Sequence, residues 1–145
     1  MTTVLGQQYS TTWRGKPPHM LAPDIPVWYR FLDKHQPPFI ALYYDCLLGA
    51  TWQPGSNQKD PMEKMWRDLT AKRADAIAET QAEVWLIEVA AYPGMRSLGQ
   101  LLTYETLWHQ DPKIDKPHKK ILVAEQTDPN ISASYPIHGV SVHLV

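Results

Sequence analysis

The chain has 145 residues, a hydrophobic fraction of 43% and six tryptophans, which favours one folded globular domain over a disordered tail. Its formal net charge of −1 excludes a strong overall attraction to nucleic acid or to an anionic membrane, since dedicated DNA-binding domains are usually basic. A single cysteine, Cys46, excludes an intrachain disulfide and a zinc site built from several cysteines. Because it lies in an apolar run, we expect a buried, unreactive thiol.

The first residues lack the basic and apolar regions of a signal peptide, and no run reaches the roughly 20 apolar residues that cross a bilayer. We therefore expect a soluble, cytoplasmic protein with no membrane partner. Residues 1–23 show no sustained period and contain Pro17, Pro18 and Pro23, which predicts an extended N-terminal arm. The arm carries apolar and aromatic anchors for docking on its own domain, or on protein partners or a second copy of the chain.

Residues 24–145 are expected to form a single domain. Asp24 is a candidate helix N-cap, and Pro37 and Pro38 forbid continuation of that helix. The expected elements are, in chain order, a helix over 24–35, a strand over 39–48, a loop at 54–57, a short helix over 61–69, strands over 73–79 and 83–90, a helix over 95–109, a strand over 120–125 and an edge strand over 140–145. A hairpin followed by a helical crossover predicts an α/β domain with a mixed central sheet flanked by helices.

Two carboxylates fall at the ends of neighbouring expected strands. If 73–79 pairs with 83–90 as a hairpin, Asp75 comes close to Glu88. Two such groups form a hard oxygen site suited to Mg²⁺ or Mn²⁺, which lowers the pKa of a bound water and shields the charge on a phosphate. Asp75 and Glu88 are therefore the candidate metal ligands. A lysine two residues beyond the glutamate would complete such a site, but that position is Ala90.

The element order and these residues resemble the PD-(D/E)XK nuclease superfamily. Ala74-Asp75 stands in place of the Pro-Asp dipeptide, and Glu88-Val89-Ala90 in place of Glu-x-Lys. Gln100-Leu-Leu-Thr-Tyr104 is similar to the Gln-x-x-x-Tyr element of the subfamily that resembles bacterial recombination-repair exonucleases. The resemblance covers residues 24–126 and implies a restriction-endonuclease-like αβββαβ core, an Mg²⁺ or Mn²⁺ cofactor and DNA as a partner. It also implies that Gln100 orients the site and that Tyr104 supports it and contacts nucleic acid.

Alanine cannot replace an ammonium group, and the loss of one charge-stabilising group commonly costs about 10²–10⁴-fold in rate. A displaced residue can compensate for it. Arg96 lies one helical turn before Gln100 and is the first candidate, while Lys72 and Arg73 stand just before Asp75. The alternative for Arg96 is a side chain that simply meets solvent.

Two functions therefore stay open, and with them whether the chain is an enzyme. The first is a catalytically degenerate nuclease-like domain, a pseudoenzyme that acts as a structural or DNA-associated module in a larger assembly. Compact domains of this kind often come from phages, so a phage particle is one candidate assembly and a virion a second location. The second is an active Mg²⁺-dependent DNA nuclease with a migrated catalytic basic residue. Ala90 and the near-neutral charge favour the first; convergence of Asp75 and Glu88 with Arg96 or Lys72 would favour the second.

Several other residues have a structural explanation beside a functional one. Clustered lysines are usually solvated surface, and histidines without a companion at ligand spacing are weak metal candidates. Tryptophans can stack on bases, but packing explains them at least as well. The residues concerned are Lys113, Lys116, Lys119, Lys120, His109, His118, Trp28, Trp52, Trp66, Trp85 and Trp108.

Overall fold

The computed structural model describes residues 3–49, 60–62, 65 and 72–145. Its helices are α1 (Ile25–His35), α3 (Met95–Gln110), α4 (Pro129–Ser132) and α5 (Ser134–Ile137), and its strands are β1 (Ala41–Tyr43), β2 (Leu47–Leu48), β3 (Lys72–Arg73), β4 (Ala76–Glu79), β5 (Val84–Ala90), β6 (His118–Ala124) and β7 (Val140–Leu144). Across these ranges, no helix has the length and apolar character to span a membrane. The loop expected at 54–57 lies outside the described residues, as does most of the short helix expected over 61–69.

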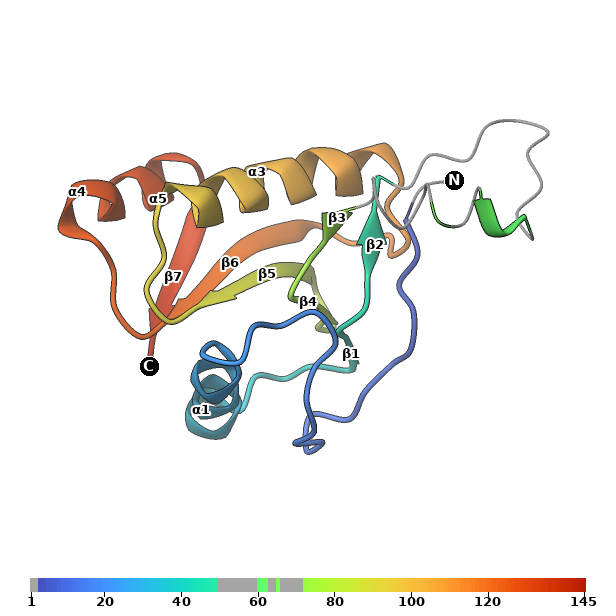
Figure 1. Cartoon of the computed structure of the whole chain (residues 1–145), viewed down its shortest axis with the longest axis horizontal. Helices are drawn as coiled ribbons and strands as arrows, with labels where there is room; N and C mark the ends of the chain where they lie inside the picture. Colours follow the sequence, from blue (N-terminus) through green and yellow to red (C-terminus); the bar gives the residue numbers. More distant parts are fainter. Residues whose placement is uncertain (1–2, 50–59, 63–64, 66–71) are drawn as a thin grey trace.

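Five strands form a mixed sheet in the order β1-β4-β5-β6-β7, and β2 pairs with β3 in a separate two-stranded sheet. β1, β4 and β5 are antiparallel neighbours, whereas β5, β6 and β7 run parallel. Figure 1 shows α3, α4 and α5 on one side of the large sheet and α1 on the other. This arrangement confirms the predicted α/β domain with a mixed sheet flanked by helices.

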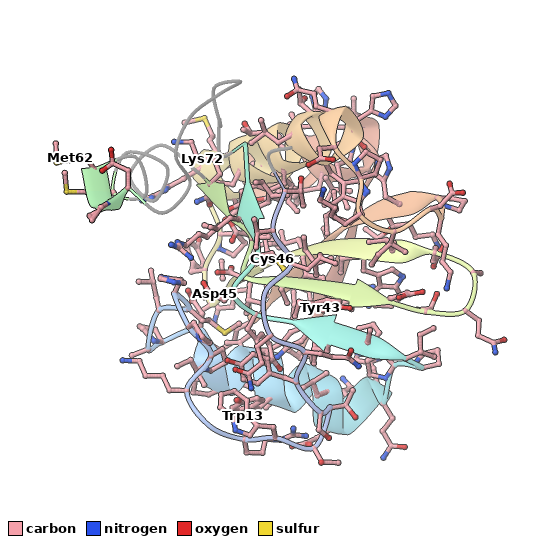
Figure 2. All side chains as sticks on the ribbon, turned by 90° about the vertical axis from the view of Figure 1, so that its right-hand side faces the viewer. Trp13, Tyr43, Asp45, Cys46, Met62 and Lys72 are labelled. Carbon is pink, nitrogen blue, oxygen red and sulfur yellow. The ribbon has the colours of Figure 1, made fainter. Side chains whose placement is uncertain are left out.

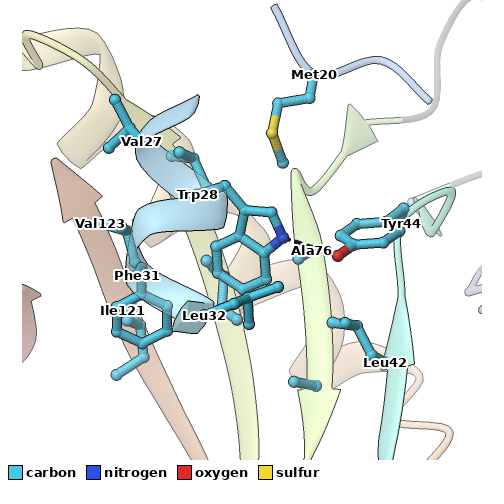
Figure 3. Packing of buried hydrophobic residues seen from close by; sticks show 13 residues of the cluster. Met20, Val27, Trp28, Phe31, Leu32, Leu42, Tyr44, Ala76, Ile121 and Val123 are labelled. Carbon is cyan, nitrogen blue, oxygen red and sulfur yellow. Dashed lines mark hydrogen bonds between the residues drawn. The ribbon is translucent and has the colours of Figure 1, made fainter. Parts of the chain in front are cut away.

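One hydrophobic core lies between the sheet and α1. Its helix residues Val27, Trp28, Phe31 and Leu32 recur with the helical period, so they share one face and are all buried. Figure 3 shows these side chains packed over the strands, with the Trp28 indole directed at Tyr44. The indole N–H donates to the Tyr44 hydroxyl at 2.8 Å, which gives both buried polar groups a partner. The helix expected over 24–35 is confirmed.

A second core lies between the sheet and α3. Leu101, Tyr104 and Trp108 are buried on the inner face of that helix, against strand residues such as Leu86 and Leu122. The helix expected over 95–109 is confirmed. The packing explanation for the tryptophans also holds for Trp108, which is 1% exposed. The two cores enclose the central strands from both sides, as the apolar runs of β5 and β6 require.

Two expected strands are wrong as single elements. The segment 39–48 divides into β1 and β2, which belong to different sheets, and 73–79 divides into β3 and β4 in the same way. The second break has a clear cause, because the Asp75 side chain accepts the Val89 N–H at 2.7 Å in place of a backbone carbonyl. Helices α4 and α5, which were not expected, join the parallel strands β6 and β7. β7 lies at the sheet edge, as predicted.

The N-terminal arm docks on the chain's own domain. Val4 and Gln8 form isolated antiparallel bridges with Leu47 and Tyr43, so the arm follows the β1–β2 side of the molecule. Met20 is 3% exposed and packs in the core beside α1 (Figure 3). The arm is therefore placed to form one wall of a site between β2, β3 and α1.

Candidate functional site

Asp75 and Glu88 converge at the end of the β4–β5 hairpin. Ala76 pairs with Ile87 in that ladder, which places Asp75 opposite Glu88 at the next position. Both side chains are directed to the α3 face, since side chains alternate along a strand and Ile77 and Leu86 pack there. The two carboxyl groups share a side-chain hydrogen bond. The convergence expected from the hairpin is therefore present.

A cavity of about 270 Å³ opens above this pair. Its lining residues come from the arm, the start of α1, the residues before β4, strand β5 and helix α3. All five candidate site residues from the sequence line it, and Ala90 lines it as well: Asp75, Glu88, Arg96, Gln100, Tyr104 and Ala90.

Burial sets the electrostatics of the cavity. Glu88 is 5% exposed, and desolvation raises the pKa of its carboxyl group, an effect that the adjacent Asp75 and the nearby Asp24 increase. Burial likewise raises the pKa of Asp75, although its hydrogen bonds to Glu88 and to the Val89 amide oppose the shift. In the absence of a cation, the pair therefore holds a proton near neutral pH. A metal ion would have to displace that proton.

Three cations approach the cavity in different ways. Arg96 lines the cavity from α3, and its charge lowers the pKa of Glu88, opposing the shift caused by burial. Arg96 forms no hydrogen bond or ion pair with the described residues. Arg73 also lines the cavity but is held by Asp45, with 2.5 Å between Nη1 and Oδ1. Lys72 lines a neighbouring groove of about 650 Å³ instead. Arg96 is thus the cation placed to meet a ligand.

Tyr104 and Gln100 take different positions on the inner face of α3. The Tyr104 hydroxyl donates to the Arg73 carbonyl at 3.0 Å, which ties the helix to β3. Burial raises the pKa of Tyr104, so the hydroxyl stays protonated and can keep this contact. Gln100 lines both the cavity and the neighbouring groove, where its amide is available to a ligand.

The structure adds acids and a histidine that sequence reasoning missed. Asp24 occupies the N-cap position of α1 as expected, but its side chain caps no helix amide. Its carboxylate instead accepts the Ala91 N–H at 2.8 Å, which brings it to the rim of the cavity. His19 lines the cavity from the arm and contacts Asp45. No sequence spacing signals these residues, because each reaches the site from a different element.

The donor set fits a hard divalent ion. The carboxylates of Asp75 and Glu88, with the amide oxygen of Gln100 nearby, are oxygen ligands of the kind that Mg²⁺ prefers. Among residues 3–49, 60–62, 65 and 72–145, no group of three or more His, Cys, Asp or Glu side chains is arranged as a metal site. This is compatible with Mg²⁺, which usually keeps several waters and binds through one or two carboxylates plus substrate phosphate.

The remaining candidates have structural partners. Each of the four clustered lysines forms an ion pair, so together they do not make a free basic patch: Lys113 with Asp111, Lys116 with Glu79, Lys119 with Glu83 and Lys120 with Glu105. His118 also contacts Glu105. Cys46 is fully buried, its thiol donates to the Leu5 carbonyl, and burial raises its pKa, as expected for an unreactive thiol.

No family model, no curated protein and no solved structure matches this chain. Its function must therefore follow from the residues gathered around the Asp75–Glu88 pair.

Proposed function

We propose that the chain is a PD-(D/E)XK nuclease-like domain that hydrolyses DNA with the help of Mg²⁺ or Mn²⁺. The order of α1, β1, β4, β5, α3 and β6 supports a restriction-endonuclease-like αβββαβ core. In this proposal Asp75 and Glu88 correspond to the Pro-Asp and Glu-x-Lys carboxylates of that core, and Gln100 and Tyr104 to the Gln-x-x-x-Tyr element.

One observation carries this proposal. Asp75 and Glu88 converge in a cavity with Arg96, and across the described residues neither carboxylate forms an ion pair with an arginine. Keeping two carboxylates buried beside each other is costly, and a bound cation would offset that cost. Perturbed carboxyl groups in a cavity are typical of functional sites.

The chain's residues would divide the work as follows. Asp75, Glu88 and the Gln100 amide would hold the ion, which supplies Lewis-acid stabilisation of the phosphate when bound. Arg96 would neutralise charge on the phosphate oxygens, in place of the lysine absent at residue 90. Tyr104 would keep β3 and α3 together through its contact with the Arg73 carbonyl.

Cleavage of supercoiled and linear DNA in Mg²⁺ or Mn²⁺ tests the proposal. The parent chain should cut, Asp75→Ala should abolish cutting, and Asp115→Ala should leave it unchanged, since Asp115 is an exposed acid outside the cavity. Arg96→Gln should lower the rate by about 10²-fold. A parent chain that does not cut would refute the proposed enzyme.

The second candidate is the catalytically degenerate module, and Ala90 is the observation that favours it. The alanine lines the cavity at the expected lysine position, and of the lysines that the structure describes none lines that cavity. If the parent is silent but Ala90→Lys cleaves, the scaffold is intact and lost its chemistry at one residue. Silence from both would support a structural or DNA-associated role in a larger assembly, such as a phage particle.

A further inference from the structure

His19 has an unusual backbone conformation for a residue with a side chain. Its φ is 65°, in the left-handed region that L-amino acids rarely adopt. Such a conformation is strained for a residue with a side chain and persists only where the surroundings enforce it. Met20, the next residue, is buried in the α1 core, so the turn delivers the imidazole to one defined place.

Asp45 holds the His19 ring. The distance from His19 Nε2 to Asp45 Oδ1 is 2.9 Å, and the same oxygen accepts a hydrogen bond from Arg73. Asp45 lies in the segment that joins β1 to β2, and Figure 2 shows it near Cys46. A carboxylate beside Nε2 favours the tautomer that carries its proton there, which leaves the lone pair of Nδ1 free to accept a proton.

The same imidazole lines the cavity that contains Asp75 and Glu88. Its side chain is 46% exposed, so it can exchange protons with water while Asp45 orients it. The charged groups that face it across the cavity come from several elements: Asp24 before α1, Arg73 from β3, Asp75 before β4, Glu88 from β5 and Arg96 from α3. A histidine oriented by a carboxylate and open to a cavity has the parts of a general base.

We propose that His19 is the general base of this site, and that the N-terminal arm thereby supplies the basic group that residue 90 lacks. The inference rests on the proposed nuclease function. Asp45 is then a positioning residue, because it acts on the reaction only through the imidazole.

The step balances without any further reactant. His19 Nδ1 takes a proton from water as the water oxygen forms a bond to the phosphorus atom of a phosphodiester. The bond from phosphorus to the leaving oxygen breaks, and that oxygen takes a proton from solvent. The imidazolium then returns its proton to solvent, which regenerates the neutral ring.

Two variants at one position separate this role from a purely structural one. Asparagine tolerates the left-handed conformation and glycine adopts it freely, so His19→Asn and His19→Gly should both fold. We expect His19→Asn to lower the cleavage rate by about 10²–10⁴-fold with DNA binding unchanged. Imidazole added to His19→Gly should restore part of the rate, and His109→Asn, at the exposed end of α3, should behave as the parent.

The pH profile supplies an independent measurement. The pH profile of the cleavage rate should differ between the parent and His19→Asn, because only the parent has an imidazole at residue 19. Asp45→Asn should change the cleavage rate only through that imidazole.

Each outcome decides something different. Cleavage by His19→Asn at the parental rate and with the parental pH profile would overturn the role of His19 while leaving the nuclease intact. A loss that imidazole does not restore would also overturn it and would assign His19 to docking of the arm. A parent chain that never cleaves would remove the nuclease and the base together.

Discussion

Replacing Glu88 by glutamine should stabilise the metal-free protein. Glu88 is buried beside Asp75, and burial together with that neighbour raises the pKa of its carboxyl group in the folded state. In the unfolded chain the pKa returns to its ordinary value of 4.5. The folded protein therefore binds more protons than the unfolded one above that value, so this group lowers the free energy of unfolding as the pH rises.

The size of the effect follows from the pH interval. Between pH 4.5 and pH 7, each pH unit removes about 1.4 kcal/mol, which gives a ceiling of about 3 kcal/mol at pH 7. Glutamine has the same shape, carries no charge, and can donate an amide hydrogen to Asp75. Glu88→Gln should thus recover up to about 3 kcal/mol at pH 7 and almost nothing near pH 4.5.

Urea unfolding at pH 5, 6, 7 and 8 with a chelator would measure this difference. Glu125→Gln serves as the matched control, because the Glu125 side chain is 51% exposed. A Glu88→Gln variant that is no more stable than the parent at pH 7 would refute the reasoning, as would a gain that does not depend on pH. Adding Mg²⁺ should narrow the difference. An ion at 100 times its Kd stabilises the parent by about 2.7 kcal/mol, whereas the variant lacks one of the proposed ligands.

Three further changes test the fold around the site. Trp28→Phe should lower the free energy of unfolding by about 2 kcal/mol, because the buried Tyr44 hydroxyl loses its indole donor. Denaturant titration of this variant and of the double variant Trp28→Phe/Tyr44→Phe would show whether removing the hydroxyl recovers part of the loss. Gly49→Ala should lower the thermal midpoint, at a cost of about 1–2 kcal/mol, because Gly49 has a φ of 72°. Gly99→Ala should raise the thermal midpoint, because Gly99 lies on the open face of α3, where an added methyl group meets no other atom. Burial raises the pKa of Glu105, but its basic partners on β6 outweigh that effect and lower the pKa overall. The stabilisation from Glu105 is therefore present above pH 4.5 and disappears as the pH falls through the folded pKa. Glu105→Gln should therefore cost no more than about 1 kcal/mol at pH 7, with a smaller difference at pH 3, because the side chain is 35% exposed.

Local periodicity was sufficient to predict the helices that enclose the site and the pairing of its carboxylates. The apolar face of α1 and that of α3 follow the helical repeat, and alternation along a hairpin places Asp75 beside Glu88. These features depend on neighbours a few residues apart, or on one short turn, so a single sequence contains them.

The residues that sequence reasoning missed depend on contacts between distant segments. Asp24 reads locally as a helix cap, yet its carboxylate bonds to Ala91, 67 residues away. Asp45 and Arg73 are 28 residues apart and meet because the chain leaves the large sheet after β1 and joins it again only at β4, so that β2 and β3 pair separately. His19 adopts a backbone conformation that no histidine prefers, so only the packing of the arm determines its place.

The docking of the arm also orders events in time. The amide of Thr3 bonds to the Asp111 side chain across 108 residues, and Val4 and Gln8 pair with β-structure far along the chain. During synthesis the arm leaves the ribosome before the segments on which it docks, and its partner Asp111 emerges only after most of the domain has been made. Contacts of such long sequence separation form slowly, because loop-closure entropy must be overcome first. The wall that carries His19 is therefore expected to close late, so the carboxylate pair would be assembled before the cavity around it is complete.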